Sequence, residues 1–209
     1  MQKIVIHTTE EEILQFLNVA NNGEVFFETD FNAFLHFSAD VFIDLNFINT
    51  PERVKLLSQV KGLVIINSVV YTVGELELPF VRINAWPGCV ENLVEASCLD
   101  SSLKRAAETT LQRLGKKIHW LPDEPGFVTP RVICMIINEA FFALEEELSS
   151  KEEIDTAMKL GTAYPYGPFE WGKKIGLSNI VALLKRLNIE NQRYEPAPLL
   201  IKEALSGNS

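Results

Sequence analysis

The 209-residue chain lacks several features that mark common classes of protein. It has no run of lysines and arginines, and its formal net charge is −9, which argues against a nucleic-acid partner. No apolar stretch reaches membrane-spanning length, and the N-terminus shows no signal-peptide pattern. The three cysteines include no C-x-x-C pair, which argues against a disulfide framework and against a metal site. We therefore expect a cytoplasmic protein with neither a membrane nor a nucleic-acid partner.

Glycine is absent before Gly23, although the opening pattern predicts a strand followed by a helix. The run "KIVIH" (3–7) predicts a buried strand, and Thr9 with Glu12 forms a capping-box pattern. Such a turn binds a nucleotide phosphate when glycines let the backbone approach it. The predicted helix instead begins with three carboxylates, Glu10 to Glu12, each of which would repel a phosphate by roughly 0.5 to 2 kcal/mol at about 8 Å. We interpret the turn as a structural helix cap.

Beyond this turn the chain has two halves of different character. Up to residue 122, short apolar runs alternate with helical patterns, which predicts a mostly parallel sheet covered on both faces. From Pro130 onward nearly every segment has helical periodicity. The Pro/Gly-rich segment "PDEPGF" (122–127) marks the predicted hinge. The predicted strands are 3–6, 24–29, 40–47, 63–70, 80–86 and 117–121, and the predicted helices are 52–60, 101–115, 130–148, 150–161, 168–176 and 177–187.

The second half resembles the C-terminal domain of 3-hydroxyacyl-CoA dehydrogenases of the 3-hydroxybutyryl-CoA dehydrogenase type. The resemblance is carried by "DEPGFVTPRVICMIINEAFFALEE" and by "SKEEIDTAMKLGTAYPYGPFEWGKKIGL". A weaker resemblance covers "SADVFIDLNF", "VIINSVVYTVGEL" and "ENLVEASCLDSS" upstream. It implies a shortened, Rossmann-like NAD-binding-type domain (1–122, α/β, parallel sheet) followed by an all-α domain (123–209). The family's reaction is the NAD-dependent oxidation of a 3-hydroxyacyl-CoA to the 3-ketoacyl-CoA, in fatty acid metabolism.

The resemblance also says which catalytic groups to look for. In the family a histidine accepts the hydroxyl proton while hydride leaves for the nicotinamide, and a glutamate orients that imidazole. Glu95 in "NLVEA" lies at the glutamate position, but no histidine lies between His36 and His119. Glu95 either keeps a catalytic role or is a remnant whose carboxylate now bonds a backbone amide.

Two further polar positions of the family fall on residues that cannot replace them. The family serine corresponds to Val69, beside Asn67 and Ser68, and the family asparagine corresponds to Pro130. A valine side chain neither donates nor accepts a hydrogen bond, and proline has no polar side-chain atom. Three of the four catalytic positions are therefore lost.

The cofactor-binding positions also differ from those of the family. Glu28 and Asp30 end the second predicted strand, where an acid normally holds the adenosine ribose, and Asn67 is the third candidate contact. An acid at a strand end is also common on any surface. Because the glycine turn is missing, we expect no cofactor to bind tightly, with NAD as the cofactor if the activity survives.

Two other side chains have both a structural and a functional interpretation. His7 ends the first predicted strand, so it either has a new role in the crevice where such folds bind ligands or is structural. Cys89 follows a glycine, but no Cys/His constellation supports a nucleophile.

Three functions remain open from the sequence. The first is a degenerate family member without the classical reaction, acting as a binding or dimeric assembly protein, with an acyl-CoA or another small molecule as a possible ligand. The second is an active dehydrogenase with rearranged residues, and the third is an enzyme of another class that reuses the crevice. In the family the helical domain mediates homodimer contacts, and the segment 130–148 is apolar around much of its circumference. We expect a homodimer through residues 130–187.

Overall fold

The structure, a computed structural model, describes residues 2–9, 24–89 and 92–207. The chain forms two compact units, Met1–Phe127 and Val128–Ser209. The predicted helix that begins with Glu10 to Glu12 lies outside the described residues, so its interpretation stays a prediction. The predicted fold class, a mostly parallel α/β sheet followed by an all-α region, is confirmed.

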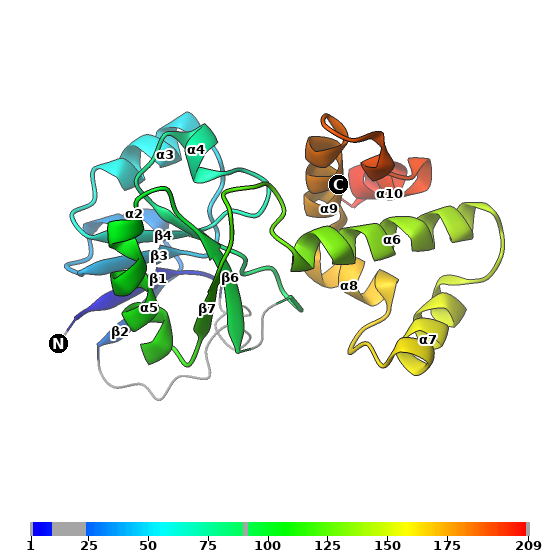
Figure 1. Cartoon of the computed structure of the whole chain (residues 1–209), viewed down its shortest axis with the longest axis horizontal. Helices are drawn as coiled ribbons and strands as arrows, with labels where there is room; N and C mark the ends of the chain where they lie inside the picture. Colours follow the sequence, from blue (N-terminus) through cyan, green and yellow to red (C-terminus); the bar gives the residue numbers. More distant parts are fainter. Residues whose placement is uncertain (1, 10–23, 90–91, 208–209) are drawn as a thin grey trace. The chain divides into compact units, whose positions relative to one another are not determined.

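The first unit is built on a seven-stranded sheet with the order β2-β1-β3-β4-β5-β6-β7 (Figure 1). All neighbouring strands are parallel except β5 and β6, which are antiparallel. The chain leaves β1 for β2 on one side and later enters β3 on the other side, so the topological switch point lies between β1 and β3. The strands are β1 (Ile4–His7), β2 (Val25–Glu28), β3 (Val41–Asp44), β4 (Leu63–Asn67), β5 (Val81–Ile83), β6 (Leu93–Ser97) and β7 (Lys117–Trp120).

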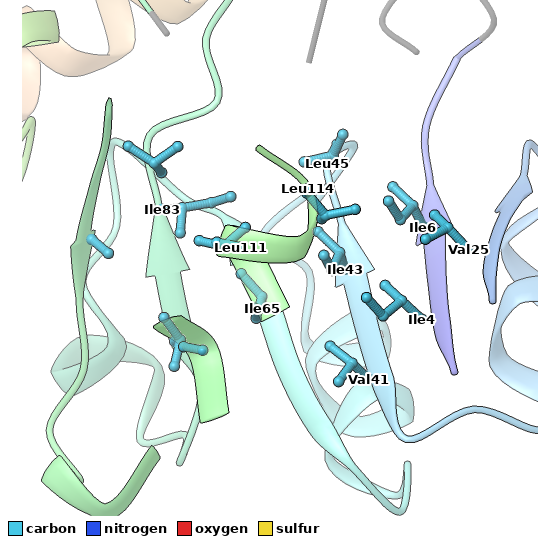
Figure 2. Packing of buried hydrophobic residues seen from close by; sticks show 14 residues of the cluster. Ile4, Ile6, Val25, Val41, Ile43, Leu45, Ile65, Ile83, Leu111 and Leu114 are labelled. Atoms are coloured by element: carbon cyan, nitrogen blue, oxygen red, sulfur yellow. The ribbon is translucent and has the colours of Figure 1, made fainter. Parts of the chain in front are cut away.

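Each face of the sheet carries its own hydrophobic core. Alternate strand residues such as Ile4, Ile43 and Ile65 pack beneath Leu111 and Leu114, at the end of helix α5 (Lys104–Arg113), on one face (Figure 2). On the other face, Val5 and Phe42 pack with the helices α2 (Phe31–His36), α3 (Pro51–Ser58) and α4 (Val73–Leu76). Coverage on both faces explains why the strands read as continuous apolar runs.

The strand β6 and the helices α2 and α4 were not predicted. Helix α4 has four residues, too few for a periodic pattern, and exists because Thr72 and Glu75 form a capping box at its start. The predicted helix 101–115 is observed as a 3-10 turn (Ser101–Leu103) followed by α5. Short elements of this kind depend on local capping rather than on periodicity.

The second unit is entirely helical, as predicted. It comprises α6 (Thr129–Glu145), α7 (Lys151–Thr162), α8 (Pro168–Ile175), α9 (Leu177–Asn188), a 3-10 turn (Gln192–Tyr194) and α10 (Pro198–Ser206) (Figure 1). No helix in the described part of the chain is long and apolar enough to cross a membrane.

The motif with the strongest family resemblance has a structural explanation. Asp155 on α7 is buried, and its carboxylate accepts hydrogen bonds from the backbone N–H groups of Phe169 (2.8 Å) and Glu170 (3.2 Å), in the first turn of α8. A Cβ atom on Gly167, which precedes α8, would overlap this carboxylate. Asp155, Gly167 and Glu170 therefore fix the contact between α7 and α8. Helix capping and packing explain this motif without a catalytic role.

Candidate functional site

Glu95, the retained family glutamate, is paired with an asparagine. It lies buried in β6, and the Asn84 side chain donates from Nδ2 to its Oε2 atom at 3.2 Å. The backbone N–H of Asn84 also donates to the Glu95 carbonyl at 2.9 Å, because β5 and β6 run antiparallel just before this point. Asn84, which directly follows β5, thus places its side-chain amide against the Glu95 carboxylate. An amide in this place cannot accept a proton as an imidazole does.

The residues around the Asn84–Glu95 contact restrict its chemistry further. The Oδ1 atom of Asn84 accepts a hydrogen bond from the backbone N–H of Trp86 at 3.2 Å, so the amide is held in one orientation. Burial, with a smaller contribution from the charge of Glu95, raises the pKa of the Cys89 thiol to about 12. Cys89 is therefore protonated at neutral pH, which argues against a role as a nucleophile.

The segment after β4 uses its polar groups to hold neighbouring loops. The Asn67 side chain donates to the carbonyl of Leu45 at 3.0 Å and accepts from the backbone N–H of Ala85 at 3.0 Å. The Ser68 hydroxyl donates to the carbonyl of Tyr71 at 2.7 Å. Val69 is buried, as expected for an apolar substitute. Asn67 therefore ties together the carboxyl ends of three strands, β3, β4 and β5.

Pro130, at the position of the family asparagine, belongs to the helical unit. It lies buried in the first turn of α6, where a missing N–H costs no helical hydrogen bond. The structure therefore gives it a role in starting this helix.

The two acids predicted to contact a cofactor ribose have different surroundings. Asp30 is the N-cap of α2, and its Oδ1 atom accepts the backbone N–H of Ala33 at 2.8 Å. Glu28 is half-buried at the end of β2, in register with His7 of β1. Asp30 thus caps a helix, which is the surface role left open by the sequence.

His7 belongs to a buried ionic cluster. Its Nδ1 atom lies 2.8 Å from Oδ1 of Asp44, and Arg53 donates to both oxygens of that carboxylate at 2.9 Å and 2.7 Å. Asp44 is completely buried and His7 is 5% exposed. The Arg53 guanidinium also lies 3.9 Å from the ring centroid of Phe31. Nη2 of Arg53 also lies 2.9 Å from Nδ1 of His7, so this nitrogen donates to Asp44 in one tautomer and accepts from Arg53 in the other.

This cluster lies at the sheet's topological switch point. His7 ends β1, Asp44 ends β3 and the two residues are in register, so they flank the crevice in which open α/β sheets bind ligands. In a dinucleotide site the first strand leads into a glycine turn that leaves room for a pyrophosphate. Here the imidazole of His7 and the carboxylate of Asp44 occupy the strand ends, and Arg53 of α3 donates to that carboxylate. The described residues at this edge therefore differ from those of a dinucleotide site.

A second buried cation, Arg82, bonds the C-terminal segment of the sheet unit. Arg82 of β5 is fully buried, donates to Asp123 at 2.5 Å and to the carbonyl of Glu124 at 2.6 Å, and stacks 4.0 Å from the ring centroid of Phe127. Desolvation lowers the pKa of its guanidinium, and the hydrogen bond to Asp123 opposes that shift. The predicted hinge segment is thereby held against the sheet unit.

Sequence reasoning missed Asp44, Arg53, Asn84 and Arg82 as members of these clusters. An acid inside an apolar strand ("VFID") and an arginine inside another ("VRI") were available signals, because buried charges require partners. Among the described residues, no group of three or more His, Cys, Asp or Glu side chains could hold a metal ion.

Comparison with known proteins agrees with this fold. Residues 126–208 match the 3-hydroxyacyl-CoA dehydrogenase C-terminal domain. A 3-hydroxyadipyl-CoA dehydrogenase of Escherichia coli is 40% identical over 132 residues, which is 62% of this chain and 28% of that protein. A 3-hydroxybutyryl-CoA dehydrogenase of Bradyrhizobium diazoefficiens is 33% identical, over 55% of this chain and 40% of that protein. Each match thus spans less than half of the curated relative.

A solved structure shows the same arrangement of elements. The crystal structure of (S)-3-hydroxybutyryl-CoA dehydrogenase from Ralstonia eutropha superposes with a TM-score of 0.70 at 29% identity, covering 88% of this chain and 71% of that one. The resemblance inferred from the sequence is confirmed by these matches.

Proposed function

Because residues 126–208 match the C-terminal domain of 3-hydroxyacyl-CoA dehydrogenases, we propose that this chain is a relative of those enzymes without their NAD-dependent reaction. It acts as a binding or dimeric assembly protein, with an acyl-CoA or another small molecule as the ligand class. The three cysteines, which all lie in the described part of the chain, form no disulfide bond, and this supports a cytoplasmic setting.

The hydrogen bond between Asn84 and Glu95 is the observation that supports this proposal most strongly. The oxidation requires an acceptor for the hydroxyl proton near neutral pH. The side chain paired with Glu95 is an amide, which has no accessible basic form, and the neighbouring thiol of Cys89 has a pKa of about 12. Val69 adds no hydrogen-bonding group. Among the described residues, neither Asn84 nor Cys89 supplies a base that the Glu95 carboxylate could orient.

The test is a turnover assay with acetoacetyl-CoA and NADH at high protein concentration. We expect no loss of NADH above the background rate. Turnover that disappears in Glu95→Gln and persists in Asp30→Asn would contradict the proposal and would favour the active dehydrogenase, because it would require Glu95 in chemistry. Turnover that disappears in His7→Gln instead would indicate a relocated proton acceptor.

Helix α6 carries the surface that supports assembly. Its groove with α7 has a volume of about 570 Å³ and is lined largely by apolar side chains, among them Met135, Ile136 and Met158. Val132 on the same helix is 52% exposed. Burying two or three such side chains contributes roughly 1.5 to 3 kcal/mol each, which is ample for an interface formed twice around a two-fold axis.

Charge along α6 favours a second copy of the chain as the occupant. Arg131 lies near the start of this helix, and Glu145, Glu146 and Glu147 lie at its end. Two antiparallel copies of α6 related by a two-fold axis place the basic start of one helix beside the acidic end of the other. The proposed dimer is therefore formed by residues 130–187 of each chain.

Light scattering during size exclusion at micromolar concentration tests the dimer. We expect twice the chain mass of 23.6 kDa, and a monomer for Ile136→Glu, which places a charge in the apolar groove. The matched control is Leu205→Glu, a 71% exposed position on α10 outside the groove and outside residues 130–187, which should remain dimeric. A mass of 23.6 kDa that does not change on concentration would contradict the dimer.

A further inference from the structure

A second cavity of the helical unit has an apolar floor. It has a volume of about 490 Å³, and its lining residues come from α6, α7, α8, α9 and α10. Phe141 and Phe169 form its floor, with their ring centroids 5.1 Å apart in an edge-to-face arrangement. The space exists because small residues line the rest, among them Gly172, Gly176 and Ala204. The volume falls within the range of small-molecule sites.

The charged groups of this cavity do not cancel. Lys151 places its ammonium group 5.6 Å and 5.4 Å from the centroids of Phe141 and Phe169 and pairs with Glu203 at 2.6 Å. A second lysine, Lys173, also lines the cavity, is exposed and makes no ion pair with any residue that the structure describes. Two ammonium groups thus face one carboxylate, in a chain whose net charge is −9.

These features select the chemistry of a ligand. An aromatic floor binds hydrocarbon, and one uncompensated ammonium group favours one negative charge at the rim. A neutral lipid leaves Lys173 without a partner. Coenzyme A, with its several phosphate charges, calls for more cations than this cavity has. This cavity shares no lining residue with the groove of α6 and α7.

We propose that the cavity binds a monoanionic amphiphile, a medium-chain carboxylate whose head group pairs with Lys173 and whose hydrocarbon chain lies on Phe141 and Phe169. The Lys151–Glu203 pair closes the inner side of the site and keeps Glu203 from repelling the ligand's carboxylate. Both the chain and the charge contribute to binding, so a ligand that has only one of them binds more weakly.

Calorimetric titration with decanoate at neutral pH tests the site, with decanol and acetate as ligands that lack the charge and the chain respectively. We expect saturable binding of decanoate below about 1 mM, and binding of decanol and acetate at least about 5-fold weaker. Lys173→Gln should weaken decanoate binding by at least about 5-fold. Its matched control is Lys174→Gln, the neighbouring exposed lysine outside the cavity lining, which should change the affinity less than about 2-fold.

Three results would overturn the proposal. The first is no saturable binding of decanoate by the wild-type chain up to about 5 mM. The second is an equal loss in Lys173→Gln and Lys174→Gln, which would indicate attraction to the general charge of α8. The third is unchanged decanoate binding in Ala204→Leu, whose larger side chain fills the cavity. The circular dichroism spectrum of this variant must match that of the wild type. Lys173→Gln tests the same site without altering the core.

Discussion

The two units of this molecule differ in which part of a family resemblance they retain. In the helical unit, the motif residues Asp155, Gly167 and Glu170 make the contact between α7 and α8. In the sheet unit, Glu95 has kept its burial but is hydrogen-bonded to an asparagine, and the end of β1 holds an ionic cluster. The motif residues of the helical unit thus contact one another, whereas the side chain that contacts Glu95 in the sheet unit is an amide.

The difference has a physical cause. A helix cap or a close backbone approach needs only its own local partners, and so it stabilises the fold whether or not a reaction takes place. A catalytic base contributes little to folding, and a glycine turn for a phosphate weakens the local backbone. Once the ligand is lost, a buried ionic cluster at the switch point can replace that turn.

The cluster at the end of β1 gives the largest expected effect. Asp44→Ala leaves Arg53 and His7 without their carboxylate in a buried place, which should lower the free energy of unfolding by roughly 3 to 5 kcal/mol in urea. Asp30→Ala removes a carboxylate from the same edge of the sheet that only caps α2, and should cost about 1 kcal/mol. Equal costs would mean that the cluster stabilises the fold no more than an exposed helix cap does.

The helical motif gives an intermediate effect. Gly167→Ala forces a methyl group onto the Asp155 carboxylate and should lower the free energy of unfolding by roughly 1 to 3 kcal/mol. Gly161→Ala in α7 is the matched control, because nothing lies within 4 Å of its added Cβ, and it should stabilise the chain by roughly 0.5 to 1 kcal/mol. Urea denaturation measures both, and a tolerated Gly167→Ala would show that the close approach is dispensable.

The smallest effect is a pH dependence of the helical unit. Backbone hydrogen bonding from Ser150 lowers the pKa of Glu153, and the hydrogen bond from Lys159 lowers that of Glu170. Groups with a depressed pKa in the folded state contribute stability above their ordinary pKa near 4.5, and that stability is lost as the pH falls below it. The urea midpoint should therefore fall as the pH is lowered from about 5 to about 3, and less so in the Glu153→Gln/Glu170→Gln double variant. Parallel profiles would assign the dependence to other carboxylates.

The sequence predicted the features that depend on periodicity and local capping. The four main helices of the second unit, and the strands around Ile4, Ile43 and Ile65, follow from apolar spacing alone. The partners of buried charges could not be predicted, because Asp44 and Arg53 meet His7 only when β1 and β3 pair across 37 residues of chain. The Asn84–Glu95 contact likewise requires the antiparallel pairing of β5 with an unpredicted strand.

Our central proposal is that the switch point of the sheet does not bind a dinucleotide tightly. A calorimetric titration with NADH at neutral pH tests it most directly, with a 3-hydroxybutyryl-CoA dehydrogenase as the positive control. The cluster of His7, Asp44 and Arg53 and the capping role of Asp30 predict a Kd no tighter than about 1 mM. Saturable binding in the micromolar range would contradict the account.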